Sequence, residues 1–487
     1  MVSECMQRRK TIHIYRGVPA SEHRYPANGG TPHMATCLPR GAALRSVLGH
    51  GSMARAATAR SFSASTTAVA NDSDAYISRE ERFGAHNYHP LPVVLNRGEG
   101  VHVWDVGGKR YLDFLSAYSA VNQGHCHPAI ANALSAQASK LALTSRAFHN
   151  DVLGAYEERV TKLFGYDKVL PMNTGVEGGE TAVKLARRWA YDVKGVPENQ
   201  ARVLFAKNNF WGRTLGAVSS STDPSSYTGF GPFMPGFDVI PYDDLDALRA
   251  ALEGDGGGDV AAFMLEPIQG EAGVVVPAAD YLPGVRALCD EHNVLMIADE
   301  VQTGLGRTGA RLCVDHAGVR PDLVVLGKAL SGGMYPVSAV LADDAVMLTI
   351  KPGEHGSTYG GNPLACAVAM AALDVLEGEG LAANAEARGA QMRAGLQALV
   401  DDPAMPATLV RGKGLLNAVV IDEGAAPDAG PEGLAWDVCL EMAARGVLAK
   451  PTHGNIIRLA PPLVIGEAEV DEGVAAMRGA LEAVVNK

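Results

Sequence analysis

Short apolar runs rich in Val, Ile, Leu and Ala recur through the middle of the chain and alternate with longer stretches of helical periodicity. Runs of this kind, bounded by glycine or polar residues, are typical of strands that are buried on both faces. We expect strands at residues 169–172, 202–206, 260–265, 293–299, 323–326 and 337–341. Their alternation with helical stretches predicts an α/β domain built on a large, mostly parallel sheet.

The two ends of the body have a different pattern, which predicts a smaller α+β domain. Residues 101–106 and 110–114 alternate in polarity around a Gly-Gly turn and indicate a β-hairpin. Near the carboxyl end, residues 411–420, 432–446 and 455–462 are followed by a helix predicted at 467–485. We therefore divide the chain into a leader (1–70), an amino-terminal part of the small domain (71–118), a large domain (119–368) and the remaining small domain (369–487).

Two segments carry little periodicity. Prolines within residues 87–92 favour an extended segment in the region 74–100. Residues 223–242 are rich in Pro, Gly, Ser and aromatic residues and predict an irregular but ordered loop at a site rim or subunit interface.

A lysine directly follows one of the predicted strands. Lys328 comes after residues 323–326 and Gly327, so the strand would present its amine at the carboxyl end of the sheet. Burial disfavours the charged ammonium and lowers its pKa, which makes the free amine a nucleophile for an aldehyde. A lysine that merely caps a strand with its head in water is the alternative, and the neighbouring residues argue against it.

Those neighbours are a carboxylate and a glycine-rich junction. Asp299 ends the strand predicted at 293–299, and a carboxylate held against a pyridine nitrogen keeps that nitrogen protonated. Gly175 and Val176 lie between a strand and a long helix, where outward-pointing amides form a natural phosphate site. A plain glycine-rich connector is the alternative for this junction.

The segment Ile297-Ala-Asp-Glu-Val-Gln-Thr-Gly-Leu-Gly-Arg-Thr-Gly309, followed by residues 322–333, resembles the signature of the class III (subgroup II) aminotransferases. The similarity extends over residues 88–462. It implies the fold of the aspartate-aminotransferase type (pyridoxal-phosphate fold type I) and pyridoxal 5′-phosphate (PLP) as cofactor. The resemblance assigns Lys328 to the aldehyde, Asp299 to the ring nitrogen and Gln302 to the phenolic oxygen. Phe210 and Val301 would cover the two faces of the ring.

The same resemblance implies a shared site in a homodimer or a larger homo-oligomer. Gly175 and Val176 would bind the cofactor phosphate through backbone amides, and Thr358 would reach the phosphate of the other subunit. Arg213, Tyr88 and Tyr118 would contact the substrate.

Within the family, the stretches at residues 87–90, 173–176, 209–213, 266–271 and 450–453 are most similar to members that act on ornithine. These enzymes transfer a δ-amino group to 2-oxoglutarate and form glutamate 5-semialdehyde and glutamate. The resemblance implies that Glu271 pairs with Arg458 in one half-reaction and releases it in the other. Without that resemblance, Arg458 could equally belong to a structural ion pair.

Other functions remain as alternatives at this stage. Members of the family that act on acetylornithine or 4-aminobutyrate would share Lys328 and Asp299. A non-catalytic α/β nucleotide-binding protein is a distant alternative, since the chain lacks a Gly-x-Gly-x-x-Gly motif between a first strand and helix. His125-Cys126-His127 is not followed by a second ligand cluster, so we expect no metal site.

Charge is distributed unevenly. Residues 1–70 hold nine Lys and Arg against two Asp and Glu, a net charge of +7, whereas the remaining residues carry −19. An acidic body argues against nucleic acid as a partner, and no apolar run approaches the ~20 residues of a membrane span.

The leader from Met34 to Ala70 is rich in Arg, Ser and Ala without acidic residues, a composition typical of organellar transit peptides. We expect a start at Met34, cleavage near Phe62 or Ser63, and location in the mitochondrial matrix. A basic tail without a targeting role is the alternative. The five cysteines of the body are widely spaced, which favours reduced thiols.

Overall fold

The computed structural model describes residues 73–425 and 430–486. The predicted leader, including Met34 and the expected cleavage site at Phe62 or Ser63, lies outside the described residues. The described residues all belong to one compact unit, Ala68–Lys487.

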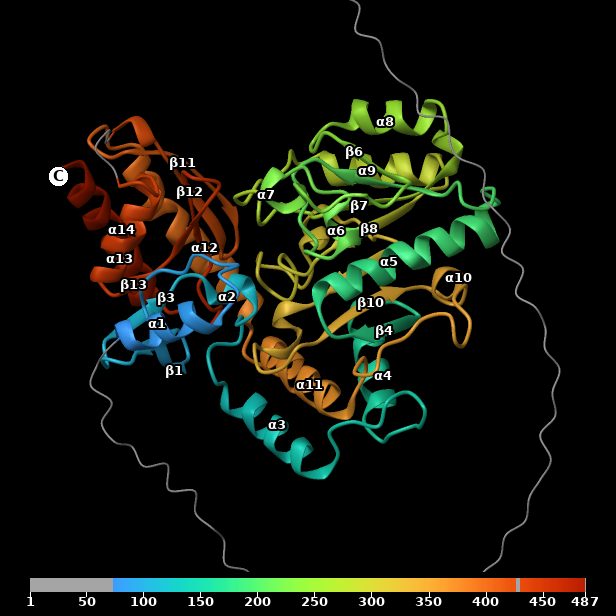
Figure 1. Cartoon of the computed structure of the whole chain (residues 1–487), viewed down its shortest axis with the longest axis horizontal. Helices are drawn as coiled ribbons and strands as arrows, with labels where there is room; N and C mark the ends of the chain where they lie inside the picture. The colour runs from blue at the N-terminus through green and yellow to red at the C-terminus, as the bar shows by residue number, and fades with distance from the viewer. Residues whose placement is uncertain (1–72, 426–429, 487) are drawn as a thin grey trace, which may run out of the picture. The chain divides into compact units, whose positions relative to one another are not determined.

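A seven-stranded sheet forms the centre of the larger part of this unit (Figure 1). Its strands are β4 (Lys168–Met172), β5 (Arg202–Ala206), β6 (Phe237–Ile240), β7 (Val260–Leu265), β8 (Leu295–Asp299), β9 (Leu323–Leu326) and β10 (Ser338–Ala342). They lie in the order β4-β10-β9-β8-β7-β5-β6. The run from β9 to β6 is parallel throughout, and β10 is antiparallel to both of its neighbours. The predicted α/β class and mostly parallel sheet are confirmed.

Alternating side chains of these strands fill two separate cores. On β9, Leu323 and Val325 join the cluster beneath helix α5 (Gly175–Trp189), whereas Val324 and Leu326 join the cluster on the opposite face. The helices of that opposite face are α3 (Pro128–Lys140), α4 (Leu153–Phe164), α8 (Leu245–Glu253), α9 (Tyr281–Glu291) and α11 (Pro363–Gly378). Burial on both faces explains why the strand sequences are continuously apolar.

Helix α5 packs very closely on the sheet because its first turns carry glycine. A Cβ atom at Gly178 would lie 2.8 Å from Val325 Cγ1, and one at Gly179 would lie 2.5 Å from the Trp211 ring. This close approach holds the helix start, Gly175, beside the strand ends.

Two smaller sheets are built from strands within residues 95–113 and 407–459. One sheet has the order β1-β2-β3-β13 and the other β11-β12-β15-β14. Their strands are β1 (Leu95–Glu99), β2 (His102–Asp105), β3 (Arg110–Asp113), β11 (Ala407–Lys413), β12 (Leu416–Ile421), β13 (Val447–Leu448), β14 (Lys450–Thr452) and β15 (Ile456–Leu459). The predicted hairpin at 101–114 is confirmed as β2 and β3.

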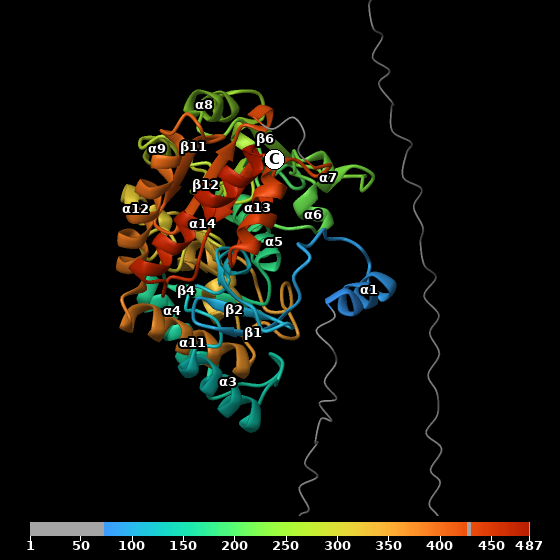
Figure 2. The same ribbon diagram turned by 90° about the vertical axis from the view of Figure 1, so that its left-hand side faces the viewer.

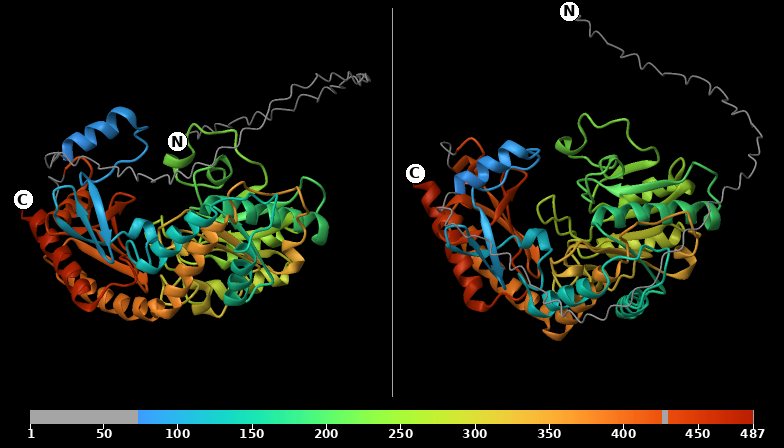
Figure 3. Two further views of the ribbon diagram at one scale, coloured as in Figure 1. Left: turned by 90° about the horizontal axis from the view of Figure 1, so that it is seen from below. Right: turned by 60° about the horizontal axis from the view of Figure 1, so that its bottom comes forward.

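The parallel pairing of β13 with β3 joins the amino-terminal hairpin to the carboxyl-terminal region, and the blue and red ribbons meet there in both views of Figure 3. Helices α12 (Leu381–Val400), α13 (Leu434–Ala444) and α14 (Glu467–Val485) pack with these strands. The domain limits stay a prediction, and the limit expected between residues 368 and 369 falls inside α11.

Two segments contain short elements that the sequence did not predict, although residues 87–92 themselves form neither helix nor strand, in agreement with the expected extended segment. Residues 223–242 contain the short helix α7 (Pro224–Tyr227), capped by Asp223, and the edge strand β6. Residues 74–100 include the helix α1 (Ser73–Phe83), which has no buried residue and stands apart from the sheets in Figure 2. None of these three elements has a strong sequence signal. Helices α1 and α7 bury few apolar side chains, and β6 spans only residues 237–240.

The remaining short elements are α2 (Ser116–Ser119), α6 (Leu215–Val218), α10 (Asp344–Met347), the π-helix η1 (Ala190–Lys194), and the 3-10 turns η2 (Gly257–Asp259), η3 (Cys313–Ala317), η4 (Lys328–Ser331) and η5 (Glu423–Ala425). In the part of the chain that the structure describes, no helix is both long and apolar enough to span a membrane. The five cysteines there are free.

A buried arginine ties the segment after β8 to the smaller sheets. Arg307 is fully buried, and its Nη1 donates to the carbonyl oxygens of Leu415 (2.9 Å) and Pro461 (2.6 Å). Its Nη2 donates to Asn122 Oδ1 at 2.6 Å. Burial lowers the pKa of Arg307 to about 9, so the side chain is still a cation at neutral pH. Three oxygen atoms from segments far apart in the sequence therefore bind the guanidinium group of Arg307.

Candidate active site

Lys328 follows β9 and Gly327, as the sequence predicts, and begins the turn η4. Its backbone φ is 43°, in the left-handed region, which costs an ordinary residue about 1–2 kcal/mol. Strain of this kind is held only where surrounding structure enforces it, and it gathers at functional sites. Within the described part of the chain, the Nζ atom has no hydrogen-bond partner. Burial lowers the pKa of Lys328, which favours the free amine.

Two buried carboxylates lie close to this amine at the ends of the neighbouring strands. Asp299 ends β8, and its Oδ1 accepts a hydrogen bond from Val301 N at 3.0 Å. Glu266 follows β7, and burial together with the charge of Asp299 raises its pKa to about 8. Burial likewise raises the pKa of Asp299 to about 6, and Lys328 lowers it in part. A cation placed here would be stabilised by both groups.

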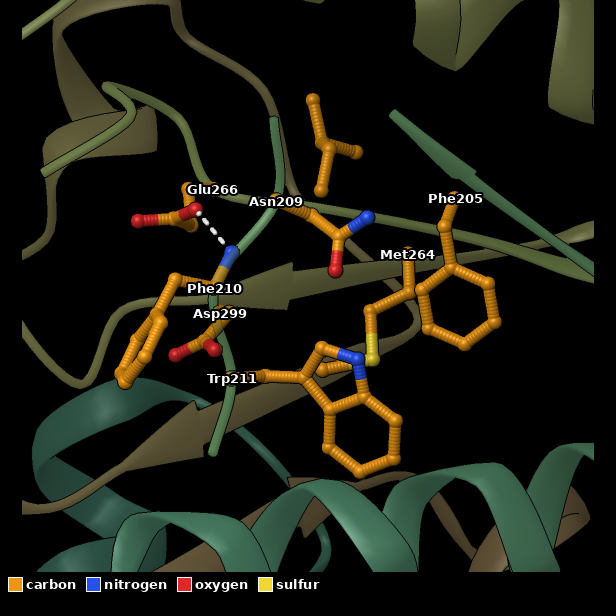
Figure 4. Close-up of a pocket in the computed structure, with 8 residues that line it drawn as sticks. Phe205, Asn209, Phe210, Trp211, Met264, Glu266 and Asp299 are labelled. Atoms are coloured by element: carbon orange, nitrogen blue, oxygen red, sulfur yellow. Dashed lines mark hydrogen bonds between the residues drawn. The ribbon is translucent and has the colours of Figure 1, made fainter. Parts of the chain in front are cut away.

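Glu266 also connects two loops, a role that the sequence analysis did not assign. Its Oε1 accepts from Phe210 N at 2.9 Å, drawn as the dashed line in Figure 4, and its Oε2 accepts from Gly270 N at 3.0 Å. One carboxylate thus holds the aromatic residue after β5 and the turn that carries Glu271. The sequence signal was present, since Glu266 directly follows residues 260–265, but Phe210 lies 56 positions away along the chain.

Phe210 and Asp299 lie near each other in Figure 4, with Trp211, Met264 and Phe205 to their right. The Trp211 and Phe205 rings stack at 5.7 Å between centroids with 6° between their planes. This rigid apolar wall fixes the backbone from which the Phe210 side chain projects.

The start of α5 meets Val301 on the other side of the site. A Cβ at Gly175 would lie 2.9 Å from Val301 Cγ1, and one at Gly327 would lie 3.2 Å from the same atom. Thr174 caps the helix in a capping box with Glu177, so the amides of Gly175 and Val176 keep no partner inside the helix. These amides are therefore available to bind an anion.

Gln302 extends from the same segment toward a second glycine. A Cβ at Gly270 would lie 2.0 Å from Gln302 Oε1, so the glycine makes room for this amide. Gly270 is also the residue bound by Glu266, which places Gln302 beside the two carboxylates.

A second cluster contains the predicted ion pair. Arg458 on β15 has a side chain that is 4% exposed, and its Nη1 lies 2.7 Å from Glu271 Oε2, which is 32% exposed. The guanidinium Cζ is 4.8 Å from the centre of the Tyr118 ring. Arg458 and Glu271 both influence the pKa of Lys328, which places this pair beside the amine.

Tyr118 is delivered by a strained left-handed turn. Residues Ser116 to Ser119, which form α2, all have φ between 47° and 70°. Asp113 holds this turn, because its Oδ1 accepts from the backbone N–H groups of Leu115 and Ser116, each at 2.9 Å. Burial raises the pKa of Tyr118, with smaller effects from Arg458, Glu271 and Tyr88.

The two histidines around Cys126 have other partners. His125 Nε2 lies 2.7 Å from Asp113 Oδ2, and His127 caps α3 and pairs with Glu379 at 3.0 Å. Among the described residues, no group of three or more His, Cys, Asp and Glu side chains is placed to hold a metal.

Three predicted residues are exposed to solvent. Tyr88 is 80% exposed, although it lies near enough to influence Tyr118. Arg213 is exposed and lies above Phe210, with 5.5 Å from Cζ to the ring centre. Thr358 is exposed on the loop after His355 and makes no hydrogen bond to any other residue that the structure describes. Ser357 anchors that loop by accepting from Asn173 Nδ2 at 2.8 Å.

The site therefore combines a nucleophilic amine, a carboxylate for a basic nitrogen, helix-start amides for an anion and a masked arginine. A model of the family "Aminotransferase class-III" matches residues 83–481. The chain belongs to the class III aminotransferases. The sequence-based family prediction is confirmed.

Curated class III relatives include mitochondrial ornithine aminotransferases. The *Drosophila melanogaster* protein is 64% identical over 413 residues, which cover 85% of this chain and 93% of the relative. The *Rattus norvegicus* protein is 64% identical over 419 residues, which cover 86% and 93%.

Solved class III structures confirm the predicted fold. Ornithine aminotransferase from *Toxoplasma gondii* matches with a TM-score of 0.82 and 47% identity, covering 85% of this chain and 96% of that one. Acetylornithine aminotransferase from *Elizabethkingia anophelis* matches with a TM-score of 0.76 and 55% identity, covering 84% and 98%. A further *Toxoplasma gondii* ornithine aminotransferase structure is described with PLP at partial occupancy in its active site.

The altered pKa of Lys328 can be tested by trace acetylation of cofactor-free protein across pH, followed by peptide mapping. Amines react as the free base, so Lys328 should reach half of its full reactivity at a lower pH than Lys168. The pKa of Lys168 is raised by its hydrogen bond to Asp344, which makes it a suitable reference. Because Asp299 raises the pKa of Lys328, Asp299→Asn should move the midpoint of Lys328 lower still. Equal midpoints for the two lysines would contradict the described electrostatics.

Proposed function

We propose that this chain is a PLP-dependent ornithine aminotransferase that transfers the δ-amino group of L-ornithine to 2-oxoglutarate. The products are glutamate 5-semialdehyde and glutamate. High identity to ornithine aminotransferases over most of both chains supports this function. The structural observation that carries it is the buried Arg458, covered by Glu271 beside the Lys328 amine.

The residues present fit PLP. Bound PLP would supply an electron sink and carry the amino group from donor to acceptor. The amine of Lys328 suits its aldehyde, and the carboxylate of Asp299 suits its ring nitrogen. The free amides of Gly175 and Val176 suit its phosphate. Glycine at positions 175 and 327 lets Val301 pack closely between the start of α5 and the residue before Lys328.

In this proposal each side chain of the site has one task. Lys328 holds the cofactor and later moves a proton as a general base, a role that its lowered pKa favours. Asp299 keeps the ring nitrogen protonated, and that positive charge would in turn lower the raised pKa of Asp299. Phe210 and Val301 restrain the ring from two sides, and Gln302 donates to the phenolic oxygen.

The two substrates place conflicting demands on one pocket. Ornithine must present its δ-amine and keep its α-carboxylate away from the reacting end, whereas 2-oxoglutarate reacts beside its own α-carboxylate. Arg458 suits that second carboxylate, because a guanidinium binds a carboxylate through two parallel hydrogen bonds. Glu271 neutralises Arg458 while ornithine reacts, and Tyr88, Tyr118 and Arg213 hold the far end of ornithine.

The ion pair between Arg458 and Glu271 can open because its two side chains are buried to different extents. Arg458 is nearly fully buried, whereas Glu271 is about one-third exposed and sits on a turn. Glu271 can therefore move into solvent at modest cost, and Arg458 is then open to the carboxylate of 2-oxoglutarate. Breaking a fully buried pair costs about 3–5 kcal/mol, and exposure of Glu271 reduces that cost.

The proposed activity predicts the product formed from ornithine. Wild-type protein with PLP and 2-oxoglutarate should yield glutamate semialdehyde, identified by NMR as its cyclised 1-pyrroline-5-carboxylate. NMR is needed because the 2-oxo acid formed by reaction at the α-amine would cyclise to an isomer of the same mass. Glu271→Ala should raise reaction at the α-amine relative to the δ-amine by about tenfold, which corresponds to ~1.4 kcal/mol and stays below the cost of a fully buried pair.

Tyr88→Phe serves as the comparison variant. It should weaken the binding of ornithine and leave the binding of glutamate nearly unchanged. The assay includes N-acetylornithine and 4-aminobutyrate, since an acetylornithine aminotransferase is among the similar structures. A 2-oxo acid as the main wild-type product from ornithine, or strong preference for another donor, would overturn the proposal.

We further propose that the active enzyme is a homodimer, or a larger homo-oligomer, in which Thr358 completes the phosphate site of the partner. Support comes from the exposed position of Thr358 on a loop whose neighbour Ser357 is anchored to Asn173. The anchor holds the loop in place while the Thr358 hydroxyl stays free for another chain.

Thr358→Ala should accordingly weaken PLP retention by several-fold, and the loss should grow on dilution. Gel filtration with absorbance detection of bound PLP measures both quantities. Thr408→Ala, which changes another exposed threonine on β11, is the control and should retain PLP normally. A stable monomer with unchanged PLP affinity in Thr358→Ala would refute the shared site.

We also propose that the protein works in the mitochondrial matrix after its leader is removed. The basic, acid-free composition of residues 34–70 and the mitochondrial names of several relatives support this location. Amino-terminal sequencing of the native protein should find a start close to Phe62 or Ser63. Native protein that retains residues 1–60 would contradict it.

A further inference from the structure

Arg213 is the proposed contact for the α-carboxylate of ornithine, yet an exposed arginine has many accessible rotamers. In the structure it is restrained at two points. Its Nη1 donates to Ser226 Oγ at 3.0 Å, and its Cζ lies 5.5 Å from the centre of the Phe210 ring. Arg213 makes no other side-chain hydrogen bond within the described residues, so the rest of its guanidinium fork is free to bind a carboxylate.

Ser226 belongs to α7, in the segment that the sequence analysis expected to be irregular. Its side chain is buried, with the residue 5% exposed, and its hydroxyl donates to Asp223 Oδ2 at 3.2 Å. Asp223 also caps α7 by accepting from Ser225 N at 2.9 Å. The short helix therefore places one buried hydroxyl between a carboxylate and the guanidinium of Arg213.

The direction of this chain of hydrogen bonds is set by chemistry. An ionised carboxylate only accepts, and a guanidinium only donates. The single hydrogen of the Ser226 hydroxyl must therefore point to Asp223, which turns the oxygen lone pairs toward Arg213.

Asp223 keeps the charge that this arrangement requires. Burial acts to raise its pKa, but hydrogen bonds from Ser225 and Ser226, together with the nearby His453, outweigh burial and lower it. The carboxylate thus stays ionised, and the orientation of the Ser226 hydroxyl is maintained. The proximity of His453 also shows that the turn between β14 and β15 approaches the same carboxylate.

We propose that Ser226, oriented by Asp223, is a positioning residue that holds Arg213 ready for the α-carboxylate of the donor substrate and so sets the preference for amino acids over simple amines. This inference rests on the proposed function, because it assumes that Arg213 binds that carboxylate. It adds two residues that touch neither the substrate nor the cofactor.

The test compares Ser226→Ala with Ser225→Ala in the PLP-loaded, full-length enzyme. Ser225 is adjacent, and its hydroxyl also donates to Asp223 Oδ2, at 2.8 Å, but no hydrogen bond joins it to Arg213. The donors are L-ornithine and 1,4-diaminobutane, which is ornithine without its carboxylate. Steady-state assays give KM and kcat for ornithine and for 2-oxoglutarate. Single-turnover spectra follow the reaction of 1,4-diaminobutane, which we expect to be slower.

Ser226→Ala should raise KM for ornithine about three- to tenfold, the usual net effect of losing one hydrogen bond, and leave kcat nearly unchanged. The rate with 1,4-diaminobutane should not move, because this donor lacks the carboxylate that Arg213 binds. Ser225→Ala should behave as wild type. Asp223→Asn, which preserves a helix cap but removes the charge, should show an intermediate rise in KM for ornithine.

The inference is overturned if Ser226→Ala leaves KM for ornithine unchanged. It is also overturned if the reactions of ornithine and 1,4-diaminobutane are impaired equally, as a general structural defect would produce. An equal effect in Ser225→Ala would overturn it too. These outcomes are distinct from failure of the proposed function, in which wild-type protein itself would not convert ornithine to pyrroline carboxylate.

Discussion

The structure depends most on one electrostatic constraint. An amine with no hydrogen-bond partner in the described part of the chain lies among buried carboxylates at the carboxyl ends of parallel strands. Lys328, Asp299 and Glu266 follow adjacent parallel strands, so the carboxyl ends of β9, β8 and β7 bring them together. Burial lowers the pKa of the amine and raises the pKa values of both acids. These shifts favour the free amine of Lys328, and a cofactor with matching charges would stabilise the cluster.

The surrounding structure holds this cluster by fixing the backbone on every side. Glu266 binds the amides of Phe210 and Gly270, and close glycine contacts bring the start of α5 against Val301. Strain remains at Lys328 and in the left-handed turn that carries Tyr118, where Asp113 compensates through hydrogen bonds. A site held this firmly can orient a cofactor without reorganising at each turnover.

In the proposed mechanism, substrate choice depends on groups that lie further from Lys328 and are held less rigidly. Arg458 is buried, whereas its partner Glu271 lies partly in solvent on a turn, and Arg213 is restrained by the buried Ser226 hydroxyl and the Phe210 ring. The inner cluster would serve both half-reactions, and the outer charges would distinguish the substrates. That separation would let one amine process two molecules of different shape.

The sequence by itself determined the strands of the large sheet other than β6, the residues at their ends and the family. A four-residue apolar run followed by Gly-Lys is a local pattern, and burial on both sheet faces leaves a strong hydrophobic signal at β7, β8 and β9. Gly175, Gly327 and Lys328 could be recognised for the same reason, since the roles expected of them follow from the residue type and its immediate neighbours in the sequence.

Only the tertiary structure decided which distant groups meet. The bond from Phe210 to Glu266, the parallel pairing of β13 with β3, and the contact of Ser226 with Arg213 join segments that carry no local signal for one another. The short elements α1, α7 and β6 also escaped prediction, because none has a periodic apolar face. Helix α1 has no buried residue, α7 is a single turn capped by Asp223, and β6 is a short strand paired with β5. Burial sets the charge state of each buried acid, and burial is a property of the folded chain as a whole.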